Sequence, residues 1–435
     1  MSKDNLVEPR TLPGFMELLP QEQIEYDIIK NVIEDTYKKF GFLPIDTPII
    51  ESAEVLLAKA GGETEKQIYR FSKGENDLTL RFDLTVPLAK YVAKNYGVLS
   101  FPFRRYQIGK VYRGERTQKG RYREFYQADI DIIGDGELSI NNDAEIPSII
   151  YSIFSKLDFG KFTIKINNRK ILSGFFESLN LQDKIIEILR IVDKIEKIGN
   201  ENVKEMLKDI SITEEDSNKI IEFITKKDEI ISYLENLDID NETYKTGVSE
   251  LKYVYNYMQT FGIPKDYYKI ELSIARGLDY YTGTIYETTL DNYPEIGSVC
   301  SGGRYENLAE YYTNKKLPGV GISIGLTRLF YILNEYNLLK TSSKSISKAI
   351  VIPMQEDISY SIKVANELRS NNINTEIYLE NKAFKKKLNY ANKQNIPYAI
   401  IIGEDEINNN IVTLKDMTSG TQENISLEEL IQKLK

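Results

Sequence analysis

Hydrophobic and polar positions alternate along several short segments of this chain. In residues 122–133, one side of the segment is apolar and the other is polar: Tyr126, Ala128, Ile130 and Ile132 against Gln127, Asp129 and Asp131. A period of two predicts a strand, and with residues 106–113 and a polar loop at 114–120 it predicts a β-hairpin. The polar face could hold a small, partly cationic ligand, or it could be the solvated face that antiparallel sheets commonly have.

The same alternation at residues 270–275 predicts a strand that ends at Arg276. Residues 78–82 predict a short strand just before Asp83 and Thr85. These two side chains could bind an ammonium group or cap the helix predicted at 86–96. A glycine-rich stretch at 318–325 leads into a helix with Arg328 in its first turn. A helix N-terminus with an arginine favours a phosphate, although such glycines also serve tight packing alone.

A period of 3.6 residues predicts helices elsewhere in the chain. Residues 21–40 carry an apolar stripe of Ile24, Ile28, Val32 and Phe40, flanked by Ile29, Ile33 and Tyr37. Residues 168–256 repeat the helical period and predict a helical domain inserted into a core of residues 1–167 and 257–340. After a polar linker at 341–347, four strands predicted at 349–353, 375–379, 398–403 and 411–415 alternate with helices and indicate a small α/β domain at 348–435.

The composition is typical of a soluble globular protein of two or three domains. The 435 residues are 41% hydrophobic and 28% charged, and no apolar run reaches the roughly 18 residues of a membrane helix. The single cysteine, Cys300, excludes an intrachain disulfide and suits a reducing cytoplasm. We expect it to be a small buried hydrophobe near the glycines at 302 and 303. The net charge of -9 argues against diffuse nucleic-acid binding, so nucleic-acid contacts would use local basic patches.

The chain contains no histidine. No imidazole is therefore available as a general base, a nucleophile or a metal ligand, which excludes the hydrolase, hydride-transfer and zinc chemistries that need one. Catalysis must rest on positioning and on charge stabilisation. One sequence does not separate codon usage of an AT-rich genome from selection as the reason for the absence.

Positive charge is concentrated in two places. The first is the predicted hairpin, in which only Glu115 and Glu124 oppose Arg104, Arg105, Lys110, Arg113, Arg116, Lys119, Arg121 and Arg123. The second is residues 275–283, Ala-Arg-Gly-Leu-Asp-Tyr-Tyr-Thr-Gly, followed by Gly-Gly-Arg-Tyr at 302–305. Arginine offers a planar fork of donors for phosphate or carboxylate. Together these residue types suit an anion beside a flat, polar aromatic ligand.

These segments resemble a known family. Arg113 with residues 120–125, and the glycine-rich segment with Arg328, resemble motifs 2 and 3 of class II aminoacyl-tRNA synthetases. Residues 276–281 with 302–305 resemble the two histidine-specific motifs of histidyl-tRNA synthetases, and residues 80–87 and 125–131 look closest to the eukaryote-like branch. The resemblance covers nearly the whole chain. Glu306, where the family usually has aspartate, keeps the charge.

The resemblance implies the fold and the activity. We expect an α+β class II catalytic domain on an antiparallel sheet with a helical insertion, and a C-terminal α/β anticodon-binding domain. The expected reaction activates L-histidine with ATP, accompanied by Mg²⁺, and transfers it to the 3′ end of tRNA(His). Residues 21–40 resemble motif 1, so we expect a homodimer, a role compatible with a core helix. The alternative is a catalytically inactive paralogue that regulates ATP phosphoribosyltransferase, which is disfavoured because the arginines and the C-terminal domain are kept. A second alternative, a synthetase-like sensor of uncharged tRNA within a larger regulator, is disfavoured by the length of the chain.

The resemblance also implies roles for individual residues. Arg113 and Arg276 would be catalytic at the α-phosphate, and ATP would also contact Arg121, Arg328 and Glu115, the last near the adenine or the magnesium ion. The residues implied for histidine are Asp83, Thr85 and Gln127 at the amino group, Asp131, Tyr280 and Tyr281 at the imidazole, Tyr305 in the wall, and Arg276. Arg116 and Gln118 would meet the tRNA acceptor end, and residues 385–387, three lysines, either meet the tRNA backbone or form a solvated face. No protein-held metal is expected.

Overall fold

The computed structural model describes the chain except for residues 1–6, 59–62, 275–280, 307–308 and 340–344. The chain divides into two units, residues 1–17 with 29–339 and residues 18–28 with 340–435, and each is described by itself. In the described parts of both, no helix combines the length and the apolar character that crossing a membrane requires.

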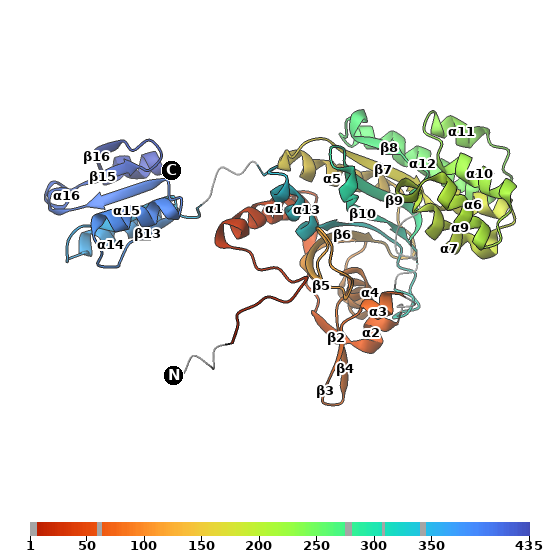
Figure 1. The fold of residues 1–435 in the computed structure, drawn as a ribbon, viewed down its shortest axis with the longest axis horizontal. Coiled ribbons are helices and arrows are strands. Elements are labelled where there is room, and N and C mark those ends of the chain that lie inside the picture. Colours follow the sequence, from red (N-terminus) through yellow and green to blue (C-terminus); the bar gives the residue numbers. More distant parts are fainter. Residues whose placement is uncertain (1–6, 59–62, 275–280, 307–308, 340–344) are drawn as a thin grey trace. The chain divides into compact units, whose positions relative to one another are not determined.

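An eight-stranded sheet organises the first unit (Figure 1). Its strands, in spatial order, are β1 (Leu43–Pro44), β5 (Phe103–Tyr112), β6 (Glu124–Ile133), β11 (Gly319–Gly325), β10 (Ser298–Tyr305), β9 (Tyr281–Leu290), β7 (Phe162–Asn168) and β8 (Tyr268–Ile270). The pairs β1–β5 and β7–β8 are parallel and the others are antiparallel. The antiparallel core and the hairpin β5–β6 confirm the predicted fold class.

The strand predicted at residues 270–275 is wrong for residues 271–274, and residue 275 lies outside the described residues. β8 ends at Ile270, and a turn follows in which the N–H of Ile274 donates to the carbonyl of Glu271. The polar Glu271 and Ser273 are buried in this turn, as are Leu272 and Ile274. The apolar alternation therefore does not report a half-buried strand, because the whole turn is buried.

Helices cover the sheet. They are α1 (Pro20–Lys39), α4 (Thr85–Asn95), α5 (Asn141–Leu157) and α13 (Leu326–Glu335). The buried side chains of α1 include Ile29, Ile33 and Tyr37, which flanked the predicted stripe, whereas Val32 on that stripe is half-buried. A three-stranded sheet of β2 (Ile50–Ser52), β4 (Asn76–Leu80) and β3 (Arg70–Lys73), with α2 (Ala53–Leu57) and α3 (Glu63–Gln67), precedes α4.

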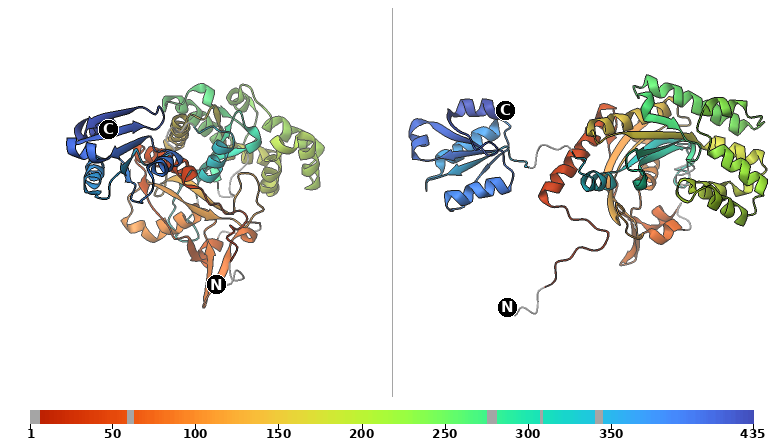
Figure 2. Two further views of the ribbon diagram at one scale, coloured as in Figure 1. Left: turned by 60° about the vertical axis from the view of Figure 1, so that its left-hand side comes forward. Right: turned by 45° about the horizontal axis from the view of Figure 1, so that its top comes forward.

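The segment between β7 and β8 is helical, as its period predicts. It comprises α6 (Arg169–Ser178), α7 (Ile185–Val192), α8 (Ile195–Ile198), α9 (Asn200–Asp209), α10 (Glu214–Ile224), α11 (Ile230–Asn236) and α12 (Glu242–Thr260). Figures 1 and 2 show these helices gathered beside β7 and β9. Gly174 and Gly247 let α6 and α12 approach closely, since a Cβ on Gly247 would lie 2.7 Å from the backbone nitrogen of Ile171.

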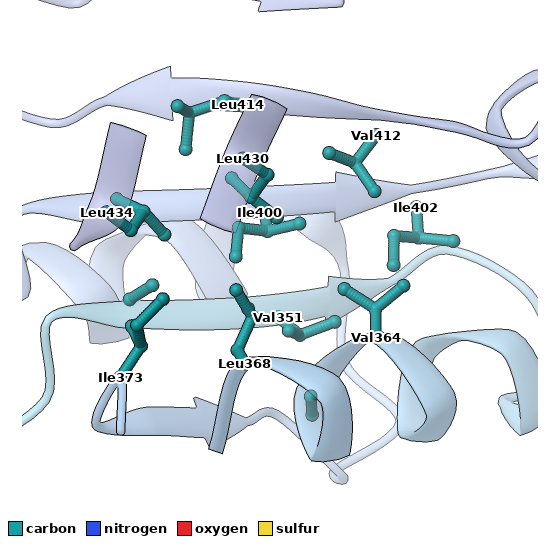
Figure 3. Packing of buried hydrophobic residues seen from close by; sticks show 12 residues of the cluster. Val351, Val364, Leu368, Ile373, Ile400, Ile402, Val412, Leu414, Leu430 and Leu434 are labelled. Carbon is teal, nitrogen blue, oxygen red and sulfur yellow. The ribbon is translucent and has the colours of Figure 1, made fainter. Parts of the chain in front are cut away.

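The second unit contains a five-stranded sheet in the order β13 (Thr375–Ile377), β12 (Ala349–Pro353), β14 (Tyr398–Ile402), β15 (Ile411–Asp416), β16 (Gln422–Ser426). Its helices are α14 (Ser359–Ser370), α15 (Phe384–Lys393), α16 (Glu404–Asn409) and α17 (Leu427–Leu434). Val351, Ile400 and Leu414 of the sheet pack with Val364 and Leu368 of α14 in one core (Figure 3). The four predicted strands are present, and β16 was missed.

Lys387 in α15 corrects one prediction. Its side chain is buried, and its Nζ donates to the carbonyl of Pro353 over 2.6 Å. Lys385 and Lys386 are exposed on the same helix. Lys387 therefore joins the helix to the end of β12 and is not available to a tRNA backbone.

Candidate active site

One cavity of about 730 Å³ lies over the polar face of β6 and the neighbouring ends of β9, β10 and β11. Ten of the predicted site residues line it: Asp83, Thr85, Arg113, Glu115, Arg121, Gln127, Asp131, Tyr281, Tyr305 and Arg328. Arg276 and Tyr280 lie outside the described residues. Arg116 and Gln118 are exposed on the hairpin loop and are not part of the cavity wall.

Glycines on β11 make room for two of these side chains. Gly321 lies opposite Asp131 in the sheet, and a Cβ there would lie 2.3 Å from Oδ1 of Asp131. A Cβ on Gly319 would lie 2.4 Å from the ring of Tyr305, its partner on β10. Neither position tolerates a side chain unless its partner moves. The glycines of this strand therefore leave the space that Asp131 and Tyr305 occupy.

Asp131 is held by two partners on neighbouring strands. The hydroxyl of Tyr305 donates to Oδ1 of Asp131 over 2.9 Å, and the fully buried Arg105 of β5 forms an ion pair with its Oδ2. Burial raises the pKa of Asp131 to about 6, although Arg105 and Tyr305 act to lower it. A carboxylate fixed in this way presents a defined acceptor to the cavity.

Asp129 lies on the same face of β6, between Gln127 and Asp131. Its side chain is 2% exposed, and burial raises its pKa to about 7 against the opposing effects of Arg105 and the hydroxyl of Ser323. Nε2 of Gln127 donates to Oγ of the same Ser323 over 2.8 Å. Among the described residues, Oδ1 of Asp129 and Oε1 of Gln127 have no hydrogen-bond partner. The alternation of β6 predicted this face, but it did not reveal that Asp129 is buried.

Asp83 caps the helix and also lies in the cavity wall. It lines the cavity, and its Oδ1 accepts hydrogen bonds from the backbone N–H groups of Thr85 and Val86 at the start of α4, over 3.1 and 2.9 Å. Burial raises its pKa, against these hydrogen bonds and Arg113. The capping contacts orient the carboxylate, whose remaining oxygen is then free of the helix.

The opposite side of the cavity carries arginines. The guanidinium of Arg113 lies 4.3 Å from the ring centre of Phe82 and 5.2 Å from that of Phe125, and its Nε donates to the carbonyl of Phe82. Arg121 lies 3.8 Å from Glu115 across the hairpin loop, and Arg328 donates to the carbonyl of Ile296. These contacts hold three cations toward one wall, where a polyanion would neutralise them.

The hairpin loop is held at its base by the N-terminal segment. The backbone N–H of Arg123 donates to the carbonyl of Gly14 over 2.8 Å, and its Nε donates to the carbonyl of Glu115. Gly14 has φ +87, and a Cβ on it would lie 2.7 Å from Cγ2 of Thr117. No sequence pattern indicated this contact, because it joins segments about a hundred residues apart.

Other residues of the wall were also missed. They come from the helical insertion and from β9 and β10: Arg169, Ile186, Leu189, Arg190, Asp193, Lys194, Glu287, Ser298, Val299 and Ser301. Cys300 was expected near the pocket, and it lies in the wall as a buried thiol whose pKa is raised by burial. The helical period of residues 185–194 predicted the helix but not which element it faces.

The cavity wall carries two sets of charged residues: Asp83, Asp129 and Asp131, here called the acidic half, and Arg113, Arg121 and Arg328, here called the cationic half. The acidic half suits an ammonium group and a polar ring, and the cationic half suits phosphates. Within the residues that the structure describes, no group of three or more carboxylate or thiol side chains could hold a metal ion. The arrangement fits a small cationic ligand placed beside a nucleotide.

The chain matches known families along most of its length. Residues 14–329 match the family described as histidyl-tRNA synthetase, and residues 348–435 match the anticodon binding domain. Curated relatives include the histidine–tRNA ligases of Clostridium tetani, 59% identical over 100% of this chain and 99% of the relative, and of Finegoldia magna, 51% identical over 99% and 100%.

Solved structures give the same result. The histidyl-tRNA synthetase of Nostoc sp. PCC 7120 superposes with a TM-score of 0.91 at 39% identity and covers 99% of both chains. A protein from Bacillus halodurans described as an ATP phosphoribosyltransferase regulatory subunit/histidyl-tRNA synthetase superposes with a TM-score of 0.75 over 90% of this chain and 97% of its own. At 19% identity it shares the fold alone.

Proposed function

We propose, because this chain belongs to the histidyl-tRNA synthetase family, that the cavity joins the carboxylate of L-histidine to the α-phosphate of ATP and then passes the histidyl group to tRNA(His). As a member of that family the chain is a histidine–tRNA ligase that uses ATP as a substrate. The observation that carries the assignment of the site is the wall itself, which brings ten residues from four sequence segments around one space.

The acidic half of the cavity binds histidine. Asp83, Thr85 and Gln127 receive the amino group, and Asp131 receives one N–H of the imidazole. Tyr281 and Tyr305 close the ring pocket, with Tyr280 assigned by the resemblance alone. A site that satisfies both ring nitrogens rejects analogues that lack them, because its buried polar groups would otherwise stay unpaired.

The cationic half binds ATP. Arg113 flanks the α-phosphate, Arg121 and Arg328 hold the β- and γ-phosphates, and Glu115 lies near the adenine or the magnesium ion. Arg276 is assigned to the α-phosphate by the resemblance. The histidine carboxylate is already ionised at neutral pH, so its attack on phosphorus requires no general base. The arginines act by neutralising charge on the phosphoryl oxygens as pyrophosphate leaves.

Magnesium arrives with ATP rather than in a protein cage. Mg²⁺ keeps several waters and is commonly held by one or two carboxylates together with substrate phosphates. Glu115 and Glu287, both in the wall, fit that pattern. When bound, the ion neutralises phosphate charge, and the residues of the chain supply the orientation.

The tRNA meets exposed surfaces outside the cavity. Arg116 and Gln118 at the tip of the hairpin loop contact the acceptor end, and their exposure leaves them accessible to it. Residues 348–435 bind the anticodon arm, with Lys385 and Lys386 available to its phosphates.

The catalytic core spans residues 1–167 and 257–340, and residues 168–256 form a domain inserted into it.

We further propose a cytoplasmic homodimer. The chain just after the segment that resembles motif 1 carries apolar side chains that are not buried in one chain: Leu43 is 58% exposed and Ile50 is 49% exposed. A second copy would cover such surface.

Histidine-dependent exchange between ATP and pyrophosphate tests the activation step. We expect exchange with L-histidine and at least a hundredfold less with other amino acids. The regulatory paralogue would bind histidine without any exchange, so a binding-competent protein that exchanges nothing would overturn the proposal.

A further inference from the structure

The acidic half of the cavity contains three carboxylates close to one buried cation. Asp83, Asp129 and Asp131 all lie in the field of Arg105, which lowers the pKa of each of them. Arg105 is fully buried and forms its ion pair with Asp131. Arg113 also lowers the pKa of Asp83, but two guanidinium groups still do not neutralise three buried carboxylates, so the free site carries excess negative charge unless a carboxyl group keeps its proton.

The three carboxyl groups differ in their partners. Asp131 accepts a hydrogen bond from Tyr305 and forms an ion pair with Arg105. Asp83 accepts hydrogen bonds from two backbone N–H groups. Asp129 interacts with the hydroxyl of Ser323, whereas its Oδ1, buried in the cavity wall, has no hydrogen-bond partner among the described residues. A buried acceptor without a donor destabilises the free site, and a ligand that supplies the donor recovers that free energy.

The position of Asp129 indicates which donor that is. It lies two residues from Gln127 and two from Asp131 on one face of β6, steps of about 7 Å along the strand. Those neighbours are proposed to hold opposite ends of histidine, the amino group and the imidazole. The side chain between them is next to the residues that hold both ends of the ligand, and the ammonium group is the stronger of the two donors because it is charged.

We infer that Asp129 is a specificity-determining residue for histidine: its Oδ1 accepts a hydrogen bond from the ammonium group, and its carboxyl group releases a proton to solvent when that group enters. The inference rests on the proposed function. The step is balanced, since Asp129–COOH and a ligand ammonium become Asp129–COO⁻ paired with the ammonium, and one proton goes to the buffer. The pKa of about 7 places this exchange in the neutral range.

The groups that face Asp129 come from every element around it. They are Arg105 of β5, Asp131 of β6, Asp83 after β4, Ser323 of β11, Tyr37 of α1 and Cys300 of β10. Burial raises the pKa of Tyr37 and of Cys300 well above neutrality, so both stay protonated and neutral. Asp131, with a pKa of about 6, is mostly ionised at pH 7.

Calorimetric titration of the full chain at pH 7, in two buffers of different ionisation enthalpy, measures the proton release. The ligands are L-histidine and imidazole-4-propionic acid, which lacks the amino group and keeps the ring. The ring pKa of each free ligand is measured first, so that the difference between the ligands can be corrected for the contribution of the imidazole. We expect wild type to release several tenths of a proton with histidine in excess of the analogue, and about fivefold less excess at pH 8.

Asp129→Asn should abolish the excess at pH 7 and should weaken histidine binding about tenfold at pH 8, with little change for the analogue. Asp238→Asn, an exposed carboxylate outside the cavity wall, controls for the change in charge. Equal proton release for histidine and the analogue in wild type would overturn the inference without any variant. An equal loss of affinity for histidine and for the analogue in Asp129→Asn would also overturn it.

The proposed function has a separate readout. If wild type exchanges pyrophosphate with histidine but releases no amine-dependent proton, the role of Asp129 fails and the activation reaction stands. If histidine neither binds nor supports exchange, the proposed function fails first.

Discussion

The hydroxyl of Tyr305 donates to Oδ1 of Asp131 over 2.9 Å, although the two residues lie 174 positions apart in the chain. Both side chains are buried, and Gly319 and Gly321 on the strand between them leave the space that they occupy. The pair therefore orients the acceptor that is proposed to read the imidazole.

Tyr305→Phe removes that donor and keeps the ring. We expect kcat/KM for histidine to fall about tenfold, the effect of one hydrogen bond to a charged group, with the KM for ATP nearly unchanged. The hydrogen bond from Tyr305 lowers the pKa of Asp131, so its loss should move the acid limb of the histidine pH profile to higher pH. Equal losses for both substrates would contradict the assignment.

Asp129→Asn should change stability in a pH-dependent way. The folded-state pKa of about 7 lies above the ordinary value for aspartate, so the stability linked to this group is fully present below about pH 4 and is lost as pH rises through 7. The variant cannot ionise at this position. We expect its Tm to exceed that of wild type at pH 8 and to match it at pH 4.5, as measured by thermal unfolding. A constant difference at both pH values would contradict this.

Arg113→Ala should slow adenylate formation by roughly a hundredfold or more, because one preorganised donor to the developing charge is lost. Transfer from preformed adenylate to tRNA should suffer less, since pyrophosphate has already left. Lysine should rescue only partly, because it loses the planar contacts with Phe82 and Phe125. Arg276→Ala should give the same pattern. Single-turnover kinetics of adenylate formation and of transfer to tRNA test this prediction. Unimpaired adenylate formation would assign these arginines a structural role.

Gly14→Ala should loosen the hairpin loop. The added Cβ would meet Thr117 and Arg123 at 2.7 and 2.8 Å, and the φ of +87 disfavours any side chain. Because the loop carries Glu115 and Arg121, we expect the KM for ATP to rise severalfold while the KM for histidine stays constant. Gly97→Ala is the matched control, since no atom lies within 4 Å of its added Cβ. An identical effect of the two substitutions would show that the contact with the N-terminal segment is immaterial.

Two neighbouring lysines of α15 should separate stability from tRNA binding. Lys387→Ala removes the buried contact with Pro353 and should lower the free energy of unfolding by about 1–2 kcal/mol. Lys386→Ala, on the exposed side, should leave stability unchanged and reduce the salt dependence of tRNA affinity by about one counterion. Thermal unfolding and binding at two salt concentrations measure both. A Lys386 variant with wild-type salt dependence would remove this face from the tRNA interface.

The sequence by itself determined the elements and the chemistry of most of the site. The alternation in residues 122–133 predicted both the strand β6 and the face that lines the cavity, because successive side chains of a strand point to opposite sides. The glycines at 318–325 predicted a strand entering a helix with Arg328, and that is how β11 and α13 are arranged. The prediction of a strand at residues 270–275 failed because a buried turn can carry the same apolar pattern as a strand.

Only the tertiary structure decided how deeply the polar residues of that face are buried and what they contact. Ser323, Arg105 and Tyr305 reach Asp129 and Asp131 from β11, β5 and β10, and the pairing of these strands sets the pKa of each carboxyl group. Likewise, Gly14 meets Arg123, and α7 of the insertion faces the cavity. Local patterns describe the face of an element, whereas desolvation and charge depend on what packs against that face. Those neighbours come from distant parts of the chain.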